Sequence, residues 1–215
     1  MAVKDRAERA DRVHVNLAGV SALAMGHFLG GFLMSAGQLM GKLAPFGAAA
    51  VAAVPGGLNG ASTLAGAALG YLVTGPLEWG IRYAAGCVVV FTLLFIFQDA
   101  KWSRLPWAAP LTAGLVMAAT RLLGCAAAGL SLLDDLPGIV SASALCAGGA
   151  FFFHEALSPR RALTELAGKR HDAAVAILAA CALMSLARIQ FMGVVSLGRV
   201  LALLVVMTAS LKGGS

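Results

Sequence analysis

Long apolar stretches separated by short polar or Pro/Gly-containing segments run through the whole chain. A membrane-spanning helix needs about 20 predominantly apolar residues, within a range of about 17 to 25. The stretches occupy residues 17–41, 43–57, 58–75, 79–97, 106–132, 136–157, 173–191 and 194–211. This pattern predicts an all-α, polytopic transmembrane helical bundle of about eight spans. The second span is short enough to be a re-entrant half-helix.

Two breaks divide the first third of the chain. Lys42 and Pro45 are expected to mark a tight external turn between the first two spans. Proline fits the first turn of the second helix, because the N–H that it lacks has no partner there. The second break is Pro55-Gly56-Gly57, with a further candidate turn at Asn59-Gly60.

The composition places these stretches in a bilayer rather than in a soluble core. Of the 215 residues, 60% are hydrophobic and only 12% are charged, whereas average soluble domains have about 25% charged residues. A soluble fold of this size could not cover so much apolar surface. We therefore expect residues 17–212 to form a transmembrane helical domain whose partner is the lipid bilayer.

The basic residues predict the orientation. They gather in a cytoplasmic N-terminal tail, 1–16, and in two polar loops, 98–105 and 158–172. The positive-inside rule asks all three to be cytoplasmic. Eight spans satisfy the rule, place Asp134-Asp135 outside and leave both termini cytoplasmic. If 43–75 were one crossing, both basic loops would lie outside, so the charges favour two crossings there.

The net charge of +6 does not indicate that the chain binds a nucleic acid. The basic residues are divided among short loops, and no DNA- or RNA-binding motif is present. Cationic loops of this kind report membrane topology instead.

Arg121 is the most unusual residue within the apolar stretches, because it lies near the middle of 106–132. A central arginine costs about 2.5–3.5 kcal/mol on insertion scales. Two interpretations stay open: a contact with a ligand or lipid headgroup, and structural hydrogen bonds to backbone carbonyls. The second is favoured, because no intramembrane acid is an obvious companion.

The other intramembrane polar residues have simpler explanations. Arg188 and Arg199 flank the turn between the last two spans and are expected to snorkel outward. His27, and His154 with Glu155, are candidate proton carriers, although a carboxylate at a helix end is usually just solvated.

Candidate catalytic and metal chemistry is missing from the sequence. Each of the four cysteines lies in an apolar stretch without zinc-site spacing and is expected to pack as a small apolar side chain: Cys87, Cys125, Cys146 and Cys181. The chain has no paired-carboxylate set, phosphate-binding loop, HExxH motif or GxSxG motif. We therefore expect no catalysis, cofactor or metal in this chain.

Pairs of glycines four residues apart recur in the apolar stretches. Such pairs put two glycines on one helix face and let helix backbones approach closely in lipid. They predict tight helix packing and lateral self-association. The pairs are Gly26 with Gly30, Gly37 with Gly41, and Gly66 with Gly70.

Two segments resemble the membrane domain of the stage II sporulation protein E family. FLMSAGQLMGKLAPFGAAAVAAV, residues 32–54, is similar to its start, where a Gly-containing first span leads into an (S/A)PFG turn and an Ala-rich second span. Here the turn is Ala44-Pro45-Phe46-Gly47. VSLGRVLALLVVMTASLKGGS, residues 195–215, resembles a late span of the family with its Lys-Gly-Gly junction. The resemblance runs from about residue 28 to 215.

The resemblance implies a longer parent protein. In that family a longer membrane domain is followed by a cytoplasmic self-association region and a metal-dependent serine/threonine phosphatase domain of the PP2C type. The phosphatase acts on a phosphorylated anti-anti-sigma factor and helps to activate the forespore sigma factor. The protein also associates with the tubulin-like division protein at the polar septum.

This chain would then be the membrane anchor and assembly platform of such a phosphatase, truncated before the catalytic domain. It would lie in the plasma membrane of a spore-forming bacterium. Manganese or magnesium would be needed only by the phosphatase domain, which is outside these 215 residues.

Two other classes stay open. A small-molecule carrier, such as the vitamin-binding membrane component of an energy-coupling-factor transporter, would use the break at 55–57 and Arg121 as its binding site. A membrane enzyme that acts on lipid or isoprenoid would need an acidic metal-binding motif, which the sequence lacks.

Overall fold

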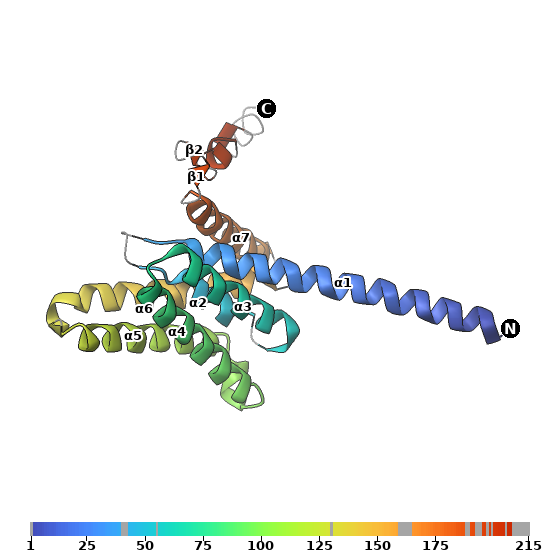
Figure 1. The fold of residues 1–215 in the computed structure, drawn as a ribbon, viewed down its shortest axis with the longest axis horizontal. Coiled ribbons are helices and arrows are strands. Elements are labelled where there is room, and N and C mark those ends of the chain that lie inside the picture. The colour runs from blue at the N-terminus through green and yellow to red at the C-terminus, as the bar shows by residue number, and fades with distance from the viewer. Residues whose placement is uncertain are drawn as a thin grey trace.

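The computed structural model describes residues 2–39, 43–54, 56–129, 131–158, 165–187, 190–191, 195–196, 198, 200–204 and 206–207. The described part is a helical bundle (Figure 1). Its elements are α1 (Ala2–Ala36), α2 (Phe46–Ala53), α3 (Gly57–Thr74), α4 (Leu77–Ile96), the 3-10 helix η1 (Lys101–Arg104), α5 (Ala108–Ala127), α6 (Leu132–Leu157), α7 (Glu165–Leu186), and the two-residue strands β1 (Gln190–Phe191) and β2 (Val195–Ser196). Apart from the ladder of two-residue strands, the described elements are helical, as predicted, whereas the number of eight spans stays a prediction.

Four helices in the described part are long and apolar enough to cross a membrane. They are Gly19–Ala36 within α1, α4, α5, and Leu133–Leu157 within α6. Large apolar side chains on their outer surfaces are exposed, among them Leu29, Ile81, Val88, Leu115, Leu123 and Val140. Exposed large apolar side chains along helices of this length and composition indicate contact with lipid, so the fold is that of a membrane-associated bundle.

Helices α1 and α3 run side by side in the same direction. A β-carbon at Gly66 would overlap the backbone of Phe28, and one at Gly70 would overlap the backbone of Phe32. The contacts follow the same order along both helices, so the two helices are parallel. The chain that connects them must therefore run back from the end of α1 to the start of α3. The described part of that return contains α2, Phe46–Ala53.

Helix α2 makes this return through the centre of the bundle. All eight of its residues are buried, and α1, α3, α4, α5 and α6 all contact it. Its sequence, FGAAAVAA, explains the position, because small side chains let surrounding helices approach closely. Leu39 and Leu43 exchange two backbone hydrogen bonds, of 2.6 and 2.9 Å, where the chain turns from α1 toward α2.

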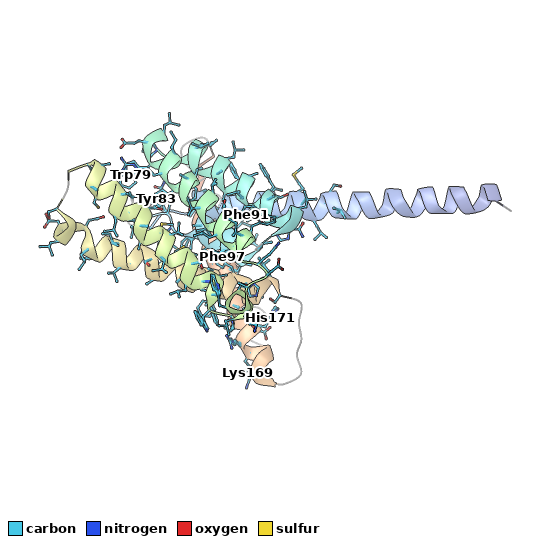
Figure 2. The ribbon with its side chains drawn as sticks, turned by 90° about the horizontal axis from the view of Figure 1, so that it is seen from below. Trp79, Tyr83, Phe91, Phe97, Lys169 and His171 are labelled. Atoms are coloured by element: carbon cyan, nitrogen blue, oxygen red, sulfur yellow. The ribbon has the colours of Figure 1, made fainter. Side chains whose placement is uncertain are left out.

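The helices define two ends of the bundle. At the first, called the Gly129 end, α1, α3, α5 and α7 finish and α4 and α6 begin. The second is called the His154 end. Helices α4 and α6 finish there, and η1 lies at the same end. Figure 2 shows Trp79 and Tyr83 toward the Gly129 end, and Phe97, Lys169 and His171 toward the His154 end.

Helix α1 is continuous from Ala2 to Ala36. The predicted tail, 1–16, is therefore helical from Ala2 onward and joins the first apolar stretch without a break. Figure 1 shows this N-terminal part projecting away from the other helices.

Two polar dipeptides expected between the apolar stretches are helical instead. Asn59-Gly60 lies inside α3, which already begins at Gly57. The break precedes it, where Gly56 and Gly57 have φ of +84° and +62°, a conformation that glycine adopts without steric cost. Asp134-Asp135, predicted to lie outside between the stretches 106–132 and 136–157, is in the first turn of α6, which begins at Leu132.

The boundaries of the seventh stretch also differ from the prediction. Helix α7 begins at Glu165, within the polar loop predicted at 158–172, and ends at Leu186 rather than at 191. Polar residues at a helix start extend the helix beyond the apolar pattern. Beyond α7, Gln190 pairs with Ser196 and Phe191 with Val195 in a short antiparallel ladder.

Candidate functional site

An ion pair joins α5 and α6 at the Gly129 end. Arg121 Nη2 donates to Asp135 Oδ1 at 2.9 Å and to Oδ2 at 2.8 Å. Cys125 Sγ donates to the same Oδ2 at 3.1 Å. The Arg121 side chain is 12% exposed and that of Asp135 is 29% exposed, so the guanidinium is mostly buried, the carboxylate is partly exposed, and the two charges neutralise each other.

The local sequence explains this geometry. Arg121 and Cys125 are four residues apart on α5 and therefore share one face. Ser131 caps the start of α6, where its Oγ accepts from Asp134 N at 3.3 Å. This cap places Asp135 in the first turn, where the helix dipole favours negative charge.

Gly138 leaves room for the pair. A β-carbon at this position would lie 2.8 Å from Asp135 Oδ1 and 2.9 Å from Arg121 Nη2. Any larger residue would therefore push the carboxylate or the guanidinium away.

A second ion pair lies on α4. Arg82 Nη2 donates to Glu78 Oε1 at 2.5 Å, four residues earlier. The two side chains are 33% and 71% exposed, and a pair this open contributes little to stability. Arg82 also reaches toward α5, since a β-carbon at Gly124 would lie 3.2 Å from its Nη1.

A cavity of about 330 Å³ brings the two pairs together. It lies between α4, α5 and the start of α6, and its other lining residues include Trp79 and Tyr83 of α4 (Figure 2). Its volume is at the lower end of ligand pockets. In the described part of the chain, Arg121 Nε is a buried donor without a hydrogen-bond partner.

The cavity therefore offers guanidinium donors and carboxylate acceptors to one small polar group. Among the described residues, no group of three or more His, Cys, Asp or Glu side chains is arranged so that it could hold a metal ion.

The partner of Arg121 corrects the sequence-based interpretation. The guanidinium bonds to a carboxylate, rather than to backbone carbonyls. Arg121 lies within the candidate span α5, which ends at Ala127, six residues and roughly 9 Å further along the helix axis. Cys125 likewise does more than pack, since it donates to Asp135.

The sequence contained a signal for Asp135 that the apolar pattern hid. Ser131 followed three residues later by Asp134 is typical of a helix start, and it moves Asp135 out of the loop and into α6. For Glu78 and Arg82, the only signal in the sequence was their spacing of four residues, and this spacing is common on exposed helix faces.

The two predicted proton-carrier sites lie elsewhere. His27 lines an apolar groove of about 310 Å³ between α1, α2, α6 and α7. His154 Nδ1 lies 3.0 Å from the carbonyl oxygen of Ala53. A carbonyl only accepts, so this nitrogen donates and caps the end of α2, which gives His154 a structural role. The carbonyl of Glu155 accepts from His171 Nδ1 at 3.1 Å.

The glycine pairs are used unequally. Gly66 and Gly70 pack against α1 inside the chain, so this pair is not available for self-association. Gly26 and Gly30 have no neighbouring atoms where a β-carbon would lie. Gly37 follows α1 and lies close to Ser185 and Phe46.

Five residues singled out in the sequence lie outside the described part of the chain: Gly41, Lys42, Pro55, Arg188 and Arg199. The composite carrier site is not formed, because the break and Arg121 are at opposite ends. Gly56 is close to Gln98, beyond the end of α4, whereas Arg121 is in the cavity at the start of α4.

The family-like turn is fully buried. Ala44, Phe46 and Gly47 have almost no exposed surface. Tyr71 Oη donates to the Ala44 carbonyl at 2.5 Å, and a β-carbon at Gly47 would lie 2.6 Å from that hydroxyl. Pro45 directly precedes α2, and its carbonyl accepts the first helical hydrogen bond, from Ala49 N.

No protein-family model, curated protein or solved structure significantly matches this chain.

Proposed function

We propose that this chain is the membrane anchor and assembly domain of a sporulation-specific PP2C-type serine/threonine phosphatase resembling stage II sporulation protein E. The observation that carries the proposal is the burial of Ala44-Pro45-Phe46-Gly47 at the centre of the bundle. The segment that carries the resemblance is thus also the segment on which the helices pack.

The geometry of this segment supports an anchoring role. Phe46 packs against Phe153 of α6, with ring centroids 6.3 Å apart, and Tyr71 of α3 holds the Ala44 carbonyl. The centre of the bundle is therefore filled by the protein's own side chains. A filled core suits a rigid platform that holds a catalytic region at the membrane.

The proposal includes eight spans with both termini in the cytoplasm. The parallel course of α1 and α3 supports a separate crossing by the segment containing α2. Lys101 and Lys169 belong to the same end of the bundle, whereas Asp134 belongs to the other. The positive-inside rule then makes the His154 end cytoplasmic.

The proposed partners follow from the resemblance. The domain would associate with itself in the plasma membrane of a spore-forming bacterium and concentrate at the polar septum. The tubulin-like division protein and the anti-anti-sigma factor would be engaged by other regions of the parent, and manganese or magnesium by its phosphatase domain.

Sequencing the genomic DNA downstream of the Ser215 codon tests the proposal directly. We expect the reading frame to continue into further spans and a phosphatase domain. A stop codon at this position, with no such domain encoded nearby, would count against the anchor function.

The charged cavity favours a second candidate, a small-molecule carrier. Two ion pairs around a volume of about 330 Å³ are more than an anchor requires. Thermal unfolding of the purified chain with a panel of water-soluble vitamins tests this function. A ligand-dependent rise in unfolding temperature would support it, and no shift across the panel would reject it for these ligands.

A further inference from the structure

The charged cavity lies between α4, α5 and the start of α6 and opens from their Gly129 end toward the middle of α5. All three helices are long and apolar enough to cross a bilayer, so this end would lie toward the membrane–water interface. Glu78 and Asp135 are in the first turns of α4 and α6, and Arg121 is in the last third of α5. Trp79 also lines the cavity, and tryptophan is enriched where the membrane meets water.

The charges in the cavity are balanced. Arg82 and Arg121 contribute two cations, and Glu78 and Asp135 contribute two anions. A purely anionic ligand would meet two carboxylates, and a purely cationic ligand would meet two guanidiniums. A group with both charges meets a partner for each.

Some hydrogen-bond donors and acceptors of these four side chains are not used within the protein. Arg121 Nε is buried without an acceptor, although a guanidinium offers donors in a fork that matches phosphate and carboxylate oxygens. The Glu78 side chain is 71% exposed and Asp135 is 29% exposed, so both carboxylates remain open to a further donor. Each carboxylate has about four lone-pair positions.

We propose that this cavity binds a zwitterionic group in which a phosphate or carboxylate lies beside a primary ammonium. The anionic part accepts from the guanidinium groups of Arg82 and Arg121, and the ammonium donates to Asp135 and Glu78. The same chemistry has two sources: the headgroup of an ethanolamine phospholipid, and a free molecule such as phosphoethanolamine. The site does not depend on the proposed anchor function.

Lipid exchange on the purified full chain tests the chemistry. The probes are phosphatidylethanolamine, phosphatidylcholine and phosphatidylglycerol with identical acyl chains, and free O-phosphoethanolamine. Phosphatidylcholine keeps the phosphate but has no N–H donor, and phosphatidylglycerol has no ammonium. We expect the ethanolamine lipid to bind about tenfold more tightly than either, as the loss of one charge-assisted interaction predicts.

Competition distinguishes the two sources. If free O-phosphoethanolamine displaces the ethanolamine lipid, the site recognises the soluble group itself. If only the lipid binds, the acyl chains are part of the ligand and the headgroup is the source. Equal binding of all three lipids together with no binding of the free molecule would overturn the proposal.

Variants connect the preference to the cavity. Glu78→Gln changes an exposed side chain and should leave the fold intact while it removes most of the preference for ethanolamine. Asp135→Asn should act in the same direction, whereas Asp134→Asn, its exposed neighbour, is the matched control. An unchanged preference in Glu78→Gln, or equal effects of the two aspartate variants, would assign the ion pairs a purely structural role.

Discussion

The guanidinium of Arg121 on α5 donates to both carboxylate oxygens of Asp135 on α6, fourteen residues later in the chain. The pair closes the turn between the two helices and provides the inner wall of the charged cavity. It explains how an arginine is accommodated in an apolar stretch: the charge is neutralised by a carboxylate from the next helix.

Asp135→Asn should lower the free energy of unfolding by about 1–3 kcal/mol, because a largely buried guanidinium loses a charged partner. Thermal unfolding in detergent, followed by circular dichroism, measures the change. Asp134→Asn is the control, since its exposed carboxylate contacts only the Ser131 cap among the contacts described. Equal stability of the two variants would show that the pair contributes nothing.

Gly66→Ala should destabilise the bundle by about 1–3 kcal/mol, because its methyl group would overlap the backbone of Phe28 on α1. Gly30→Ala is the matched control on the other helix, since open space surrounds that position. Unfolding temperature and monodispersity on gel filtration report the difference. If Gly66→Ala were tolerated as well as Gly30→Ala, the close approach of α1 and α3 would be wrong.

Tyr71→Phe should cost about 1–3 kcal/mol, because it leaves the buried Ala44 carbonyl without its donor. The aromatic ring remains, so its stacking on Tyr83, at a centroid distance of 5.3 Å, is preserved. Chemical denaturation in mixed micelles provides the measurement. A variant as stable as the wild type would show that this hydrogen bond does not stabilise the family-like turn.

Single cysteines in a cysteine-free background should report the orientation. A membrane-impermeant maleimide added to intact cells should label Ser131→Cys, at the Gly129 end, but neither Lys101→Cys nor Lys169→Cys. All three should react after the cells are permeabilised, which controls for accessibility. Labelling of Lys101→Cys or Lys169→Cys in intact cells would reverse the proposed topology.

The apolar pattern predicted most helices because each apolar stretch must satisfy its backbone polar groups internally within lipid. It located α4 to within two residues at its start and one at its end. It was less accurate where polar residues belong to helices. The first turn of α6 contains two aspartates, and the first two turns of α7 contain Glu165, Lys169, Arg170 and Asp172.

The candidate site was only half predictable. Arg121 was evident because a single charge within an apolar stretch has a high energetic cost. Asp135 was not assigned to it, since its partnership depends on where α6 begins and on how closely that turn approaches α5. Glu78 and Arg82 entered the site only because α4 lies opposite α5.

The sequence by itself determined that the chain is a helical, membrane-associated protein, since lipid contact requires apolar surface and internally paired backbone groups. The tertiary structure decided which helices touch: it placed α2 at the centre, used Gly66 and Gly70 within the chain, and joined Arg121 to Asp135. These choices depend on the mutual fit of side chains from distant segments, which no periodicity along a single stretch records.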